Sequence, residues 1–122
     1  MAYRSDVALT MSHKLKDMIL EKGKSRLTVD DHYLLRQLLN GSDADTFIEN
    51  DKGIFFYMTR MKWYTTHYPE IRLVEEFVEM HEEECHFVRL GESFDDLVDI
   101  GSFTGVVKIR LSPPIQFTEV KN

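Results

Sequence analysis

The chain is 122 residues long with a formal net charge of −6, a length that suits one domain and is too short for two independent cores. Hydrophobic residues make up 43% of the chain and charged residues 30%, so a core can form and a disordered chain is excluded. We expect residues 1–122 to fold as a single domain, and the acidic balance opposes binding to a phosphate backbone.

The first part of the chain predicts one strand followed by two helices. Apolar residues alternate with polar ones over residues 3–11, which is typical of a strand. Apolar residues then recur at intervals of three and four over residues 13–22, so a short helix is expected to end at Gly23. Thr28 has the side chain of a helix cap, and a second helix is predicted from there to Asn40.

The middle of the chain predicts a hairpin and an acidic helix. Residues 46–49 lead into the turn sequence Asn50–Gly53, and a long return strand follows over residues 54–64. Pro69 is tolerated at a first helical position, and apolar residues at helical spacing follow it. A helix over residues 69–83 is therefore expected, with a polar side that is almost entirely glutamate.

The last part of the chain predicts two clear strands, over residues 85–90 and 107–111, and residues 115–117 could add a short edge strand. The segment 92–105 is ambiguous between a helical turn with its loop and an irregular excursion. Omitting one helix from the predicted order leaves βαββαβ. We therefore predict an α+β domain of the ferredoxin-like class, an antiparallel sheet with helices on one face and an extra helix in the N-terminal half.

Cysteine content and hydropathy indicate the compartment. Cys85 is the only cysteine, which excludes an intrachain disulfide and a four-cysteine zinc module. No apolar run approaches the roughly 20 residues that span a bilayer, and the N-terminus carries charge where a signal peptide has an apolar core. We expect a cytoplasmic protein that does not enter membranes. An edge strand near Pro113-Pro114 could pair with a second copy, which leaves a homodimer open.

Several clusters contain side chains that bind metals, but without the spacing of a known site. His81, Cys85 and His86 adjoin three glutamates, and a further ligand to His81 and Cys85, such as His67, would have to come from elsewhere in the chain. The acidic residues between Glu92 and Asp99 miss the spacing of a calcium-binding loop. The sequence has no phosphate loop, nucleophile elbow or kinase signature. We predict no metal, no cofactor and no catalytic residue, with a small metal-dependent enzyme as an alternative.

Residues 52–58 faintly resemble the RNP1 stretch of RNA recognition motifs, a family in which aromatic side chains on the sheet stack on bases. Phe55 and Tyr57 would be the side chains concerned. Ile54 stands where that family has an aromatic residue, and the predicted first strand lacks the aromatic residue of the partner motif. The resemblance implies an alternative function, an RNA- or single-stranded-DNA-binding module that uses the aromatic sheet face.

The negative charge is concentrated in one part of the chain. Residues 70–99 hold 11 acidic and two basic side chains, a formal charge of −9, whereas the remaining residues together carry +3. A helix and a loop in this window would present a field that steers toward basic partners. Trp63 and Tyr64 are candidate aromatic anchors at the rim, and Trp63 could instead belong to the core. The predicted acidic contact residues are Glu75, Glu76, Glu79, Glu82, Glu83, Asp95, Asp96 and Asp99.

The chain resembles small bacteriophage and prophage proteins of unassigned function. The resemblance rests on the segments Ala2–Val7, Lys62–Tyr64, Tyr68–Glu70, Phe87–Glu92 and Asp95-Asp96. It implies a context and no residue roles: small acidic phage proteins often inhibit host enzymes or defence systems, including restriction and CRISPR nucleases. We therefore predict a non-enzymatic inhibitor that binds a host protein through its acidic face, where it could mimic nucleic acid. The expected partner has a basic or nucleic-acid-binding surface.

Overall fold

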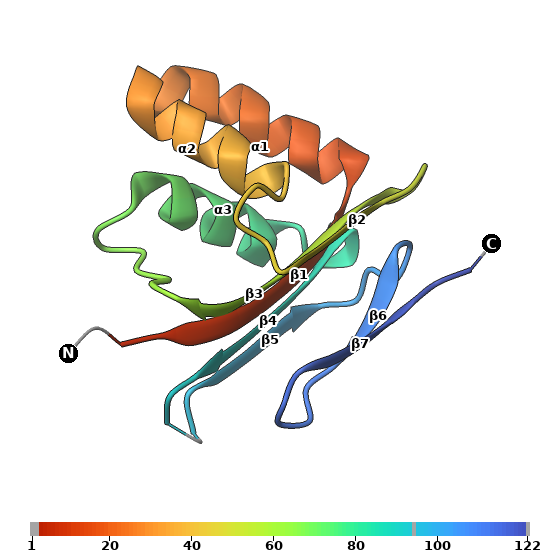
Figure 1. Ribbon diagram of the computed structural model, residues 1–122. Helices are drawn as coiled ribbons and strands as arrows, with labels where there is room; N and C mark the ends of the chain where they lie inside the picture. The colour runs from red at the N-terminus through yellow and green to blue at the C-terminus, as the bar shows by residue number, and fades with distance from the viewer. Residues whose placement is uncertain (1–2, 94, 122) are drawn as a thin grey trace.

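The structure, a computed structural model, describes residues 3–93 and 95–121. It has three layers, which are helices, a five-stranded sheet and a two-stranded hairpin (Figure 1). The elements in chain order are β1 (Ser5–Ser12), α1 (His13–Arg26), α2 (Val29–Leu39), β2 (Thr46–Glu49), β3 (Gly53–Met61), α3 (Pro69–Met80), the 3-10 turn η1 (Glu82–Glu84), β4 (Cys85–Gly91), β5 (Leu97–Gly101), β6 (Val107–Arg110) and β7 (Gln116–Glu119).

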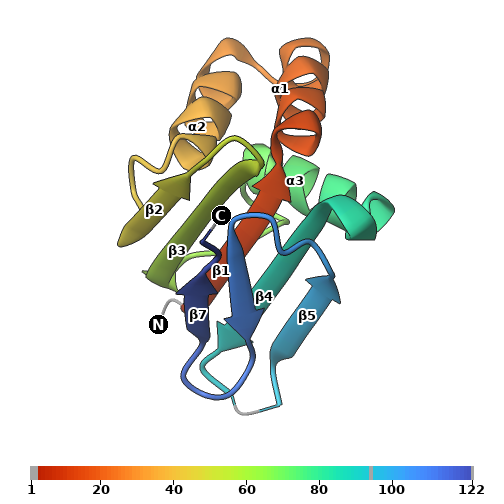
Figure 2. The same ribbon diagram turned by 90° about the vertical axis from the view of Figure 1, so that its right-hand side faces the viewer.

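The five-stranded sheet is antiparallel throughout, with the strand order β2-β3-β1-β4-β5. The helices α1, α2 and α3 cover one face of this sheet, and the β6-β7 hairpin lies against the other (Figure 2). The predicted α+β class is therefore confirmed. The ferredoxin-like topology is not confirmed by this order, because β5 extends the sheet beyond β4.

The strand β5 lies in the segment that the sequence leaves ambiguous. It pairs with β4, and its Val98 and Ile100 pack against the core beneath the helices. Asp99 lies between these two residues and points to the opposite face of the sheet. Because β5 has only five residues, its alternation of apolar and polar side chains is too short to recognise in the sequence. Phe94, which the sequence suggests as an apolar anchor of the preceding loop, lies outside the described residues.

Two helix ends differ from the predicted ones. The helix α1 continues through Gly23 to Arg26. A Cβ at Gly23 would lie only 2.7 Å from Leu35 Cδ2 of α2. The glycine permits close helix packing and does not end the helix. The helix α3 ends at Met80 and not at residue 83, and Glu82–Glu84 form η1. Acidic side chains at a helix C-terminus interact unfavourably with the helix dipole. No helix in the described part of the chain is long and apolar enough to cross a bilayer.

The larger core lies between the helices and the sheet. In β1, Val7, Leu9 and Met11 are fully buried on the helix side, whereas Ala8 is fully buried on the hairpin side. This central strand is therefore apolar on both faces, as expected for a strand covered by a layer on each side. The centre of the sheet is thus buried on both faces, whereas the edge strands β2 and β5 retain exposed residues.

The β6-β7 hairpin covers the aromatic face of β3. Phe55 is fully buried, and its ring centroid lies 4.7 Å from that of Phe117 in β7. Tyr57 is partly buried and lies 5.4 Å from the same ring. A nucleic-acid-binding module that stacks bases on this face needs the face to be open. In this structure the hairpin covers that face, so Phe55 is not accessible for stacking on a base.

Candidate functional site

Three of the predicted acidic residues remain exposed at the end of α3 and in η1. These are Glu79, Glu82 and Glu83, and no Lys or Arg nitrogen of the described residues lies within 4.0 Å of their carboxylates. We call these three residues the acidic flank. The carbonyl groups at the C-terminus of α3 add partial negative charge at the same place. The acidic flank therefore carries a charge that the described part of the chain does not neutralise.

Glu76 lies on α3 but is paired within the chain. Arg26, the last residue of α1, donates a hydrogen bond of 2.8 Å from Nη1 to Glu76 Oε2. This bond lowers the pKa of Glu76, and the charge of Arg26 adds to the effect. The pair joins the end of α1 to the middle of α3, so the charge of Glu76 is compensated locally.

Glu75 is half-buried above the core. Burial raises the pKa of its carboxyl, while the charge of Arg89 and the nearby indole N–H of Trp63 oppose the rise. Trp63 is only 6% exposed, its ring centroid lies 5.7 Å from that of Phe87, and its Nε1 has no hydrogen-bond partner within 3.5 Å in the described residues. Trp63 is thus a core residue and not an exposed aromatic anchor.

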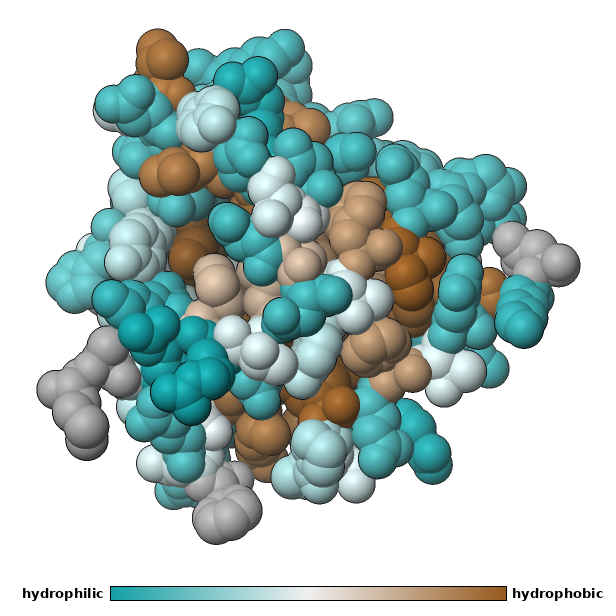
Figure 3. Space-filling view, in the orientation of Figure 1, coloured by the Kyte–Doolittle hydropathy of each residue, from teal (hydrophilic) through white to brown (hydrophobic). Residues whose placement is uncertain are grey.

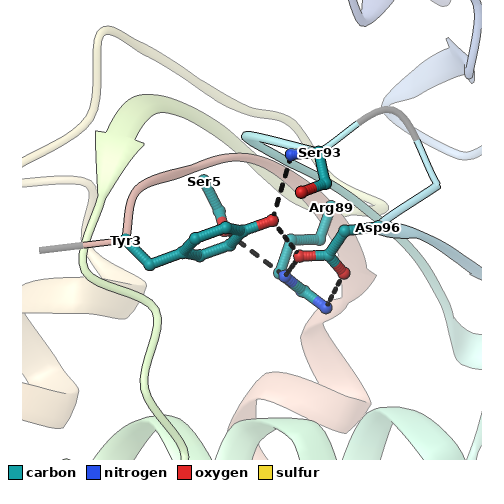
Figure 4. A network of polar contacts seen from close by, with 5 residues as sticks. All are labelled: Tyr3, Ser5, Arg89, Ser93 and Asp96. Atoms are coloured by element: carbon teal, nitrogen blue, oxygen red, sulfur yellow. Dashed lines mark hydrogen bonds and ion pairs between the residues drawn. The ribbon is translucent and has the colours of Figure 1, made fainter.

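Asp96 is held in a polar network that joins the segment before β1 to β4 and the loop before β5 (Figure 4). Arg89 donates hydrogen bonds of 3.2 and 3.0 Å to the Asp96 carboxylate and one of 3.3 Å to Ser5 Oγ. The Tyr3 hydroxyl donates to Asp96 Oδ2 and accepts from the Ser93 N–H. The bonds from Tyr3 and Arg89 lower the pKa of Asp96. Asp96 is therefore a structural anion whose charge is compensated.

The other two predicted aspartates lie apart from the acidic flank in different ways. Asp99 points to the hairpin side of the sheet, where its Oδ1 lies 2.7 Å from His86 Nε2. Asp95 is exposed in the loop before β5. The structure therefore brings together Glu79, Glu82 and Glu83 and directs Asp99 to another face of the molecule.

Tyr64, the second predicted aromatic anchor, has a structural contact of its own. Its hydroxyl donates a 2.6 Å hydrogen bond to the carbonyl oxygen of Tyr3. Its ring stacks on that of Tyr68 at a centroid distance of 6.1 Å, and the side chain is half-buried. Tyr64 thus ties the segment before β1 to the loop that leads into α3.

A hollow of about 940 Å³ lies between α1 and the end of α3, next to the acidic flank. Its apolar lining comes from Met18, Phe77 and Met80, and the Met80 side chain is 67% exposed. Asp17, Glu21, Lys22 and Lys24 of α1 form the charged part of the lining. The composition, an apolar centre with a charged rim, is typical of surfaces that bind other proteins.

The predicted metal-ligand side chains point to different partners. Cys85 is fully buried, and its Sγ lies 3.6 Å from the carbonyl oxygen of Val78 and 3.4 Å from that of His81. The His81 ring stacks on Phe77 and the His67 ring lies beside Tyr64. Within residues 3–93 and 95–121, no three His, Cys, Asp or Glu side chains are placed to hold a metal ion.

A second charged site was not expected from the sequence. Arg4, Arg60 and Lys62 line a hollow of about 270 Å³ where β1 begins and β3 ends, and the buried Glu70 lies in its wall. Arg4 and Arg60 are 56 positions apart in the chain, and they come together only because β1 pairs with β3. The basic pair Arg60 and Lys62 at the end of a strand was the only local signal.

The chain was compared with known protein families, curated proteins and solved structures, and none of these comparisons finds a match.

Proposed function

We propose that this chain is a non-enzymatic inhibitor that binds a host protein through the acidic flank. The observation that carries the proposal is the exposure of Glu79, Glu82 and Glu83 without a counter-ion in the described residues. Carboxylates without an internal partner are free to meet Lys and Arg side chains of another molecule. Such charges accelerate association and fix the orientation of the partners.

The hollow beside the acidic flank supports a protein as the partner. Met80 is 67% exposed and borders both the flank and the hollow, and Phe77 and Met18 extend the apolar lining. A protein partner can meet the carboxylates with basic side chains and place an apolar side chain in the hollow. This combination of a hydrophobic centre and a charged rim is the usual anatomy of a protein interface.

The biological setting is proposed from the resemblance to phage proteins. A restriction or CRISPR nuclease has a basic groove for nucleic acid, and a row of carboxylates could occupy such a groove as a mimic of phosphates. The inhibitor would then act in the cytoplasm of a bacterial host. Two further residues are proposed as secondary contacts at the rim of the interface: Glu75, which precedes the flank on α3, and Asp95, which is exposed.

The ferredoxin-like description is proposed for part of the sheet only. The strands β2, β3, β1 and β4 are adjacent in that order, and all their pairs are antiparallel. These neighbour relationships support a βαββαβ arrangement that β5, the extra helix and the β6-β7 hairpin extend.

The proposal is tested by charge reversal combined with affinity capture. The triple variant Glu79→Lys, Glu82→Lys and Glu83→Lys and the wild-type chain are used to capture proteins from a bacterial lysate, and bound proteins are identified by mass spectrometry. A matched control reverses Asp43, Asp51 and Glu119, which are exposed residues elsewhere on the molecule and give the same change in net charge.

We expect the wild type and the control to capture the same partner and the triple variant to lose it. Binding of the purified partner should weaken as salt concentration rises, because exposed charges are screened. Equal capture by the triple variant would show that the acidic flank is not the interface. Loss of capture by both variants would mean that net charge alone is responsible, and this too would contradict the proposal.

A further inference from the structure

The hollow lined by Arg4, Arg60 and Lys62, called the basic hollow below, lies at the N-terminal end of α3. The acidic flank lies at the other end of this helix. Arg4 immediately precedes β1, Arg60 lies at the end of β3 and Lys62 just after it, and Glu70 lies in the first turn of α3. Figure 1 places these chain segments together at the left of the molecule. In the same orientation, Figure 3 shows strongly hydrophilic side chains gathered at the left, with a few hydrophobic ones beside them.

The three cations of this hollow have no anionic partner in the described residues. Neither the guanidinium groups of Arg4 and Arg60 nor the ammonium group of Lys62 lies within 4.0 Å of a carboxylate. Arg4 Nη1 instead donates a 3.2 Å hydrogen bond to the carbonyl oxygen of Arg60. The positive charge of the three side chains that line this hollow is therefore not neutralised by an ion pair within the described part of the chain.

The backbone of Arg60 has a strained conformation. Its φ of 57° lies in the left-handed region, which is costly for a residue with a Cβ. The register between β1 and β3 shifts here, and the Arg60 N–H donates a 3.0 Å hydrogen bond to Asp6 Oδ1. Irregularities of this kind re-aim a side chain, and strained residues concentrate at functional sites.

Glu70 supplies an unpaired polar group in the wall of the same hollow. The residue is only 7% exposed, and its Oε1 has no hydrogen-bond partner in the described residues. Burial raises the pKa of this carboxyl, its own backbone N–H opposes the rise, and the charge of Asp31 adds to it. A buried oxygen without a partner is costly unless a ligand or water satisfies it.

We propose that this hollow binds a small phosphomonoester whose organic part carries a hydroxyl group. Arg4, Arg60 and Lys62 hold the phosphate, and the N-terminus of α3 adds a favourable dipole. Glu70 exchanges a hydrogen bond with the hydroxyl, and the side chains of Met61, Tyr68 and Ile71 contact the carbon skeleton. Two arginines and a lysine place three positive charges around the bound anion. They therefore match a phosphate dianion better than a carboxylate, which has a single negative charge. The volume of about 270 Å³ limits the ligand to a small molecule.

The proposal is tested by NMR titration of the full chain with two probes, inorganic phosphate and ribose 5-phosphate, at constant ionic strength. The titrations are run at pH 8, where both probes are mostly dianionic, since the second pKa of a phosphomonoester is about 6 and that of inorganic phosphate is about one unit higher. We expect saturable shifts of backbone amides in residues 60–62 and 68–71. Ribose 5-phosphate should bind more tightly than inorganic phosphate, because only the sugar reaches Glu70.

Variants separate the roles of the residues. The double variant Arg60→Gly, Lys62→Gln removes two cations. Glycine accepts the left-handed backbone at position 60, so the fold should persist. The affinity for both probes should fall by roughly tenfold or more. The control, Lys108→Gln with Arg110→Gln, removes two exposed cations of β6 and should leave both affinities unchanged. Glu70→Met should abolish the preference for ribose 5-phosphate, and Glu70→Gln should keep it.

Absence of saturable binding by both probes would overturn the proposal, and so would equal affinities in the Arg60→Gly, Lys62→Gln variant and the wild type. Equal affinities of the wild type for the two probes would leave the phosphate site supported and refute the role of Glu70 and the hydroxyl. None of these results depends on the acidic flank, because the titrations contain no protein partner.

Discussion

The ring of Phe117 lies 4.7 Å from the ring of Phe55, centroid to centroid, with an angle of 47° between the ring planes. This contact joins the β6-β7 hairpin to the middle of the five-stranded sheet. The buried cluster around it also contains Ala8, Val88, Val106, Val107, Ile109 and Ile115. The hairpin is thus an integral layer of the domain with a core of its own, and it decides which surfaces of the sheet can meet another molecule.

Truncation of Phe55 tests whether the hairpin layer contributes to stability. Phe55 is fully buried, so Phe55→Ala should lower the free energy of unfolding by about 3–5 kcal/mol. Tyr33→Ala is the matched control, because this aromatic side chain of α2 is 53% exposed and its loss should cost under about 1 kcal/mol. The measurement is urea denaturation followed by circular dichroism. Similar losses for the two variants would mean that the hairpin does not pack on the sheet.

Removal of the Asp96 charge should destabilise the chain in a pH-dependent manner. Its bonds to Tyr3 and Arg89 lower its pKa in the folded state, so the stabilisation is present above the unfolded pKa of about 4 and is lost as pH falls through the folded pKa. Asp96→Asn should therefore cost about 1 kcal/mol near neutral pH, where solvent screens part of the interaction, and nothing in strong acid. Thermal unfolding at several pH values measures this.

The adjacent Asp95 provides the control for Asp96. It is exposed, so Asp95→Asn should change stability by less than about 0.5 kcal/mol at any pH. Tyr3→Phe should reproduce part of the loss caused by Asp96→Asn, because it removes one of the two hydrogen-bond donors. If the Asp95 and Asp96 variants behave alike, the network of Figure 4 does not stabilise the fold.

Glu70 should show the opposite dependence on pH. Its pKa is raised by burial, so folding favours the protonated form, and stability falls as pH rises from the unfolded value of about 4.3 through the folded pKa. Glu70→Gln should stabilise the chain by about 1 kcal/mol near neutral pH and by less in acid. Urea denaturation at two pH values measures the gain. Glu79→Gln, at an exposed site of the same helix, should give no such gain.

Cys85 should be inert toward thiol reagents in the folded protein. Burial, followed by the charges of Glu82, Glu83 and Glu84, raises the pKa of its thiol to about 12, so almost no thiolate is present at pH 8. We expect a chromogenic disulfide reagent to label the denatured chain at once and the native chain only at the rate of unfolding. Ser102→Cys, at an exposed position, should react rapidly in the native state. Fast labelling of native Cys85 would contradict its burial.

Local sequence signals were sufficient where the interacting groups are close along the chain. Thr28 caps α2 by accepting a hydrogen bond from the Asp31 N–H at 3.1 Å, as its position before an apolar helix predicts. Asn50 Oδ1 accepts from the N–H groups of Lys52 and Gly53 and makes the predicted turn between β2 and β3. The donor and acceptor are at most three residues apart in each case, so few alternative partners compete.

The sequence by itself determined the α+β class, most of the elements and the region that carries the negative charge, because periodicity, caps and turns are properties of neighbouring residues. Tertiary structure decided which of those charges are compensated. Arg26 meets Glu76 across 50 positions and Tyr3 meets Asp96 across 93, and no pattern within a few residues announces such pairs. The same long-range pairing covers Phe55 with a hairpin and gathers the basic hollow, since packing places together residues that chain order separates.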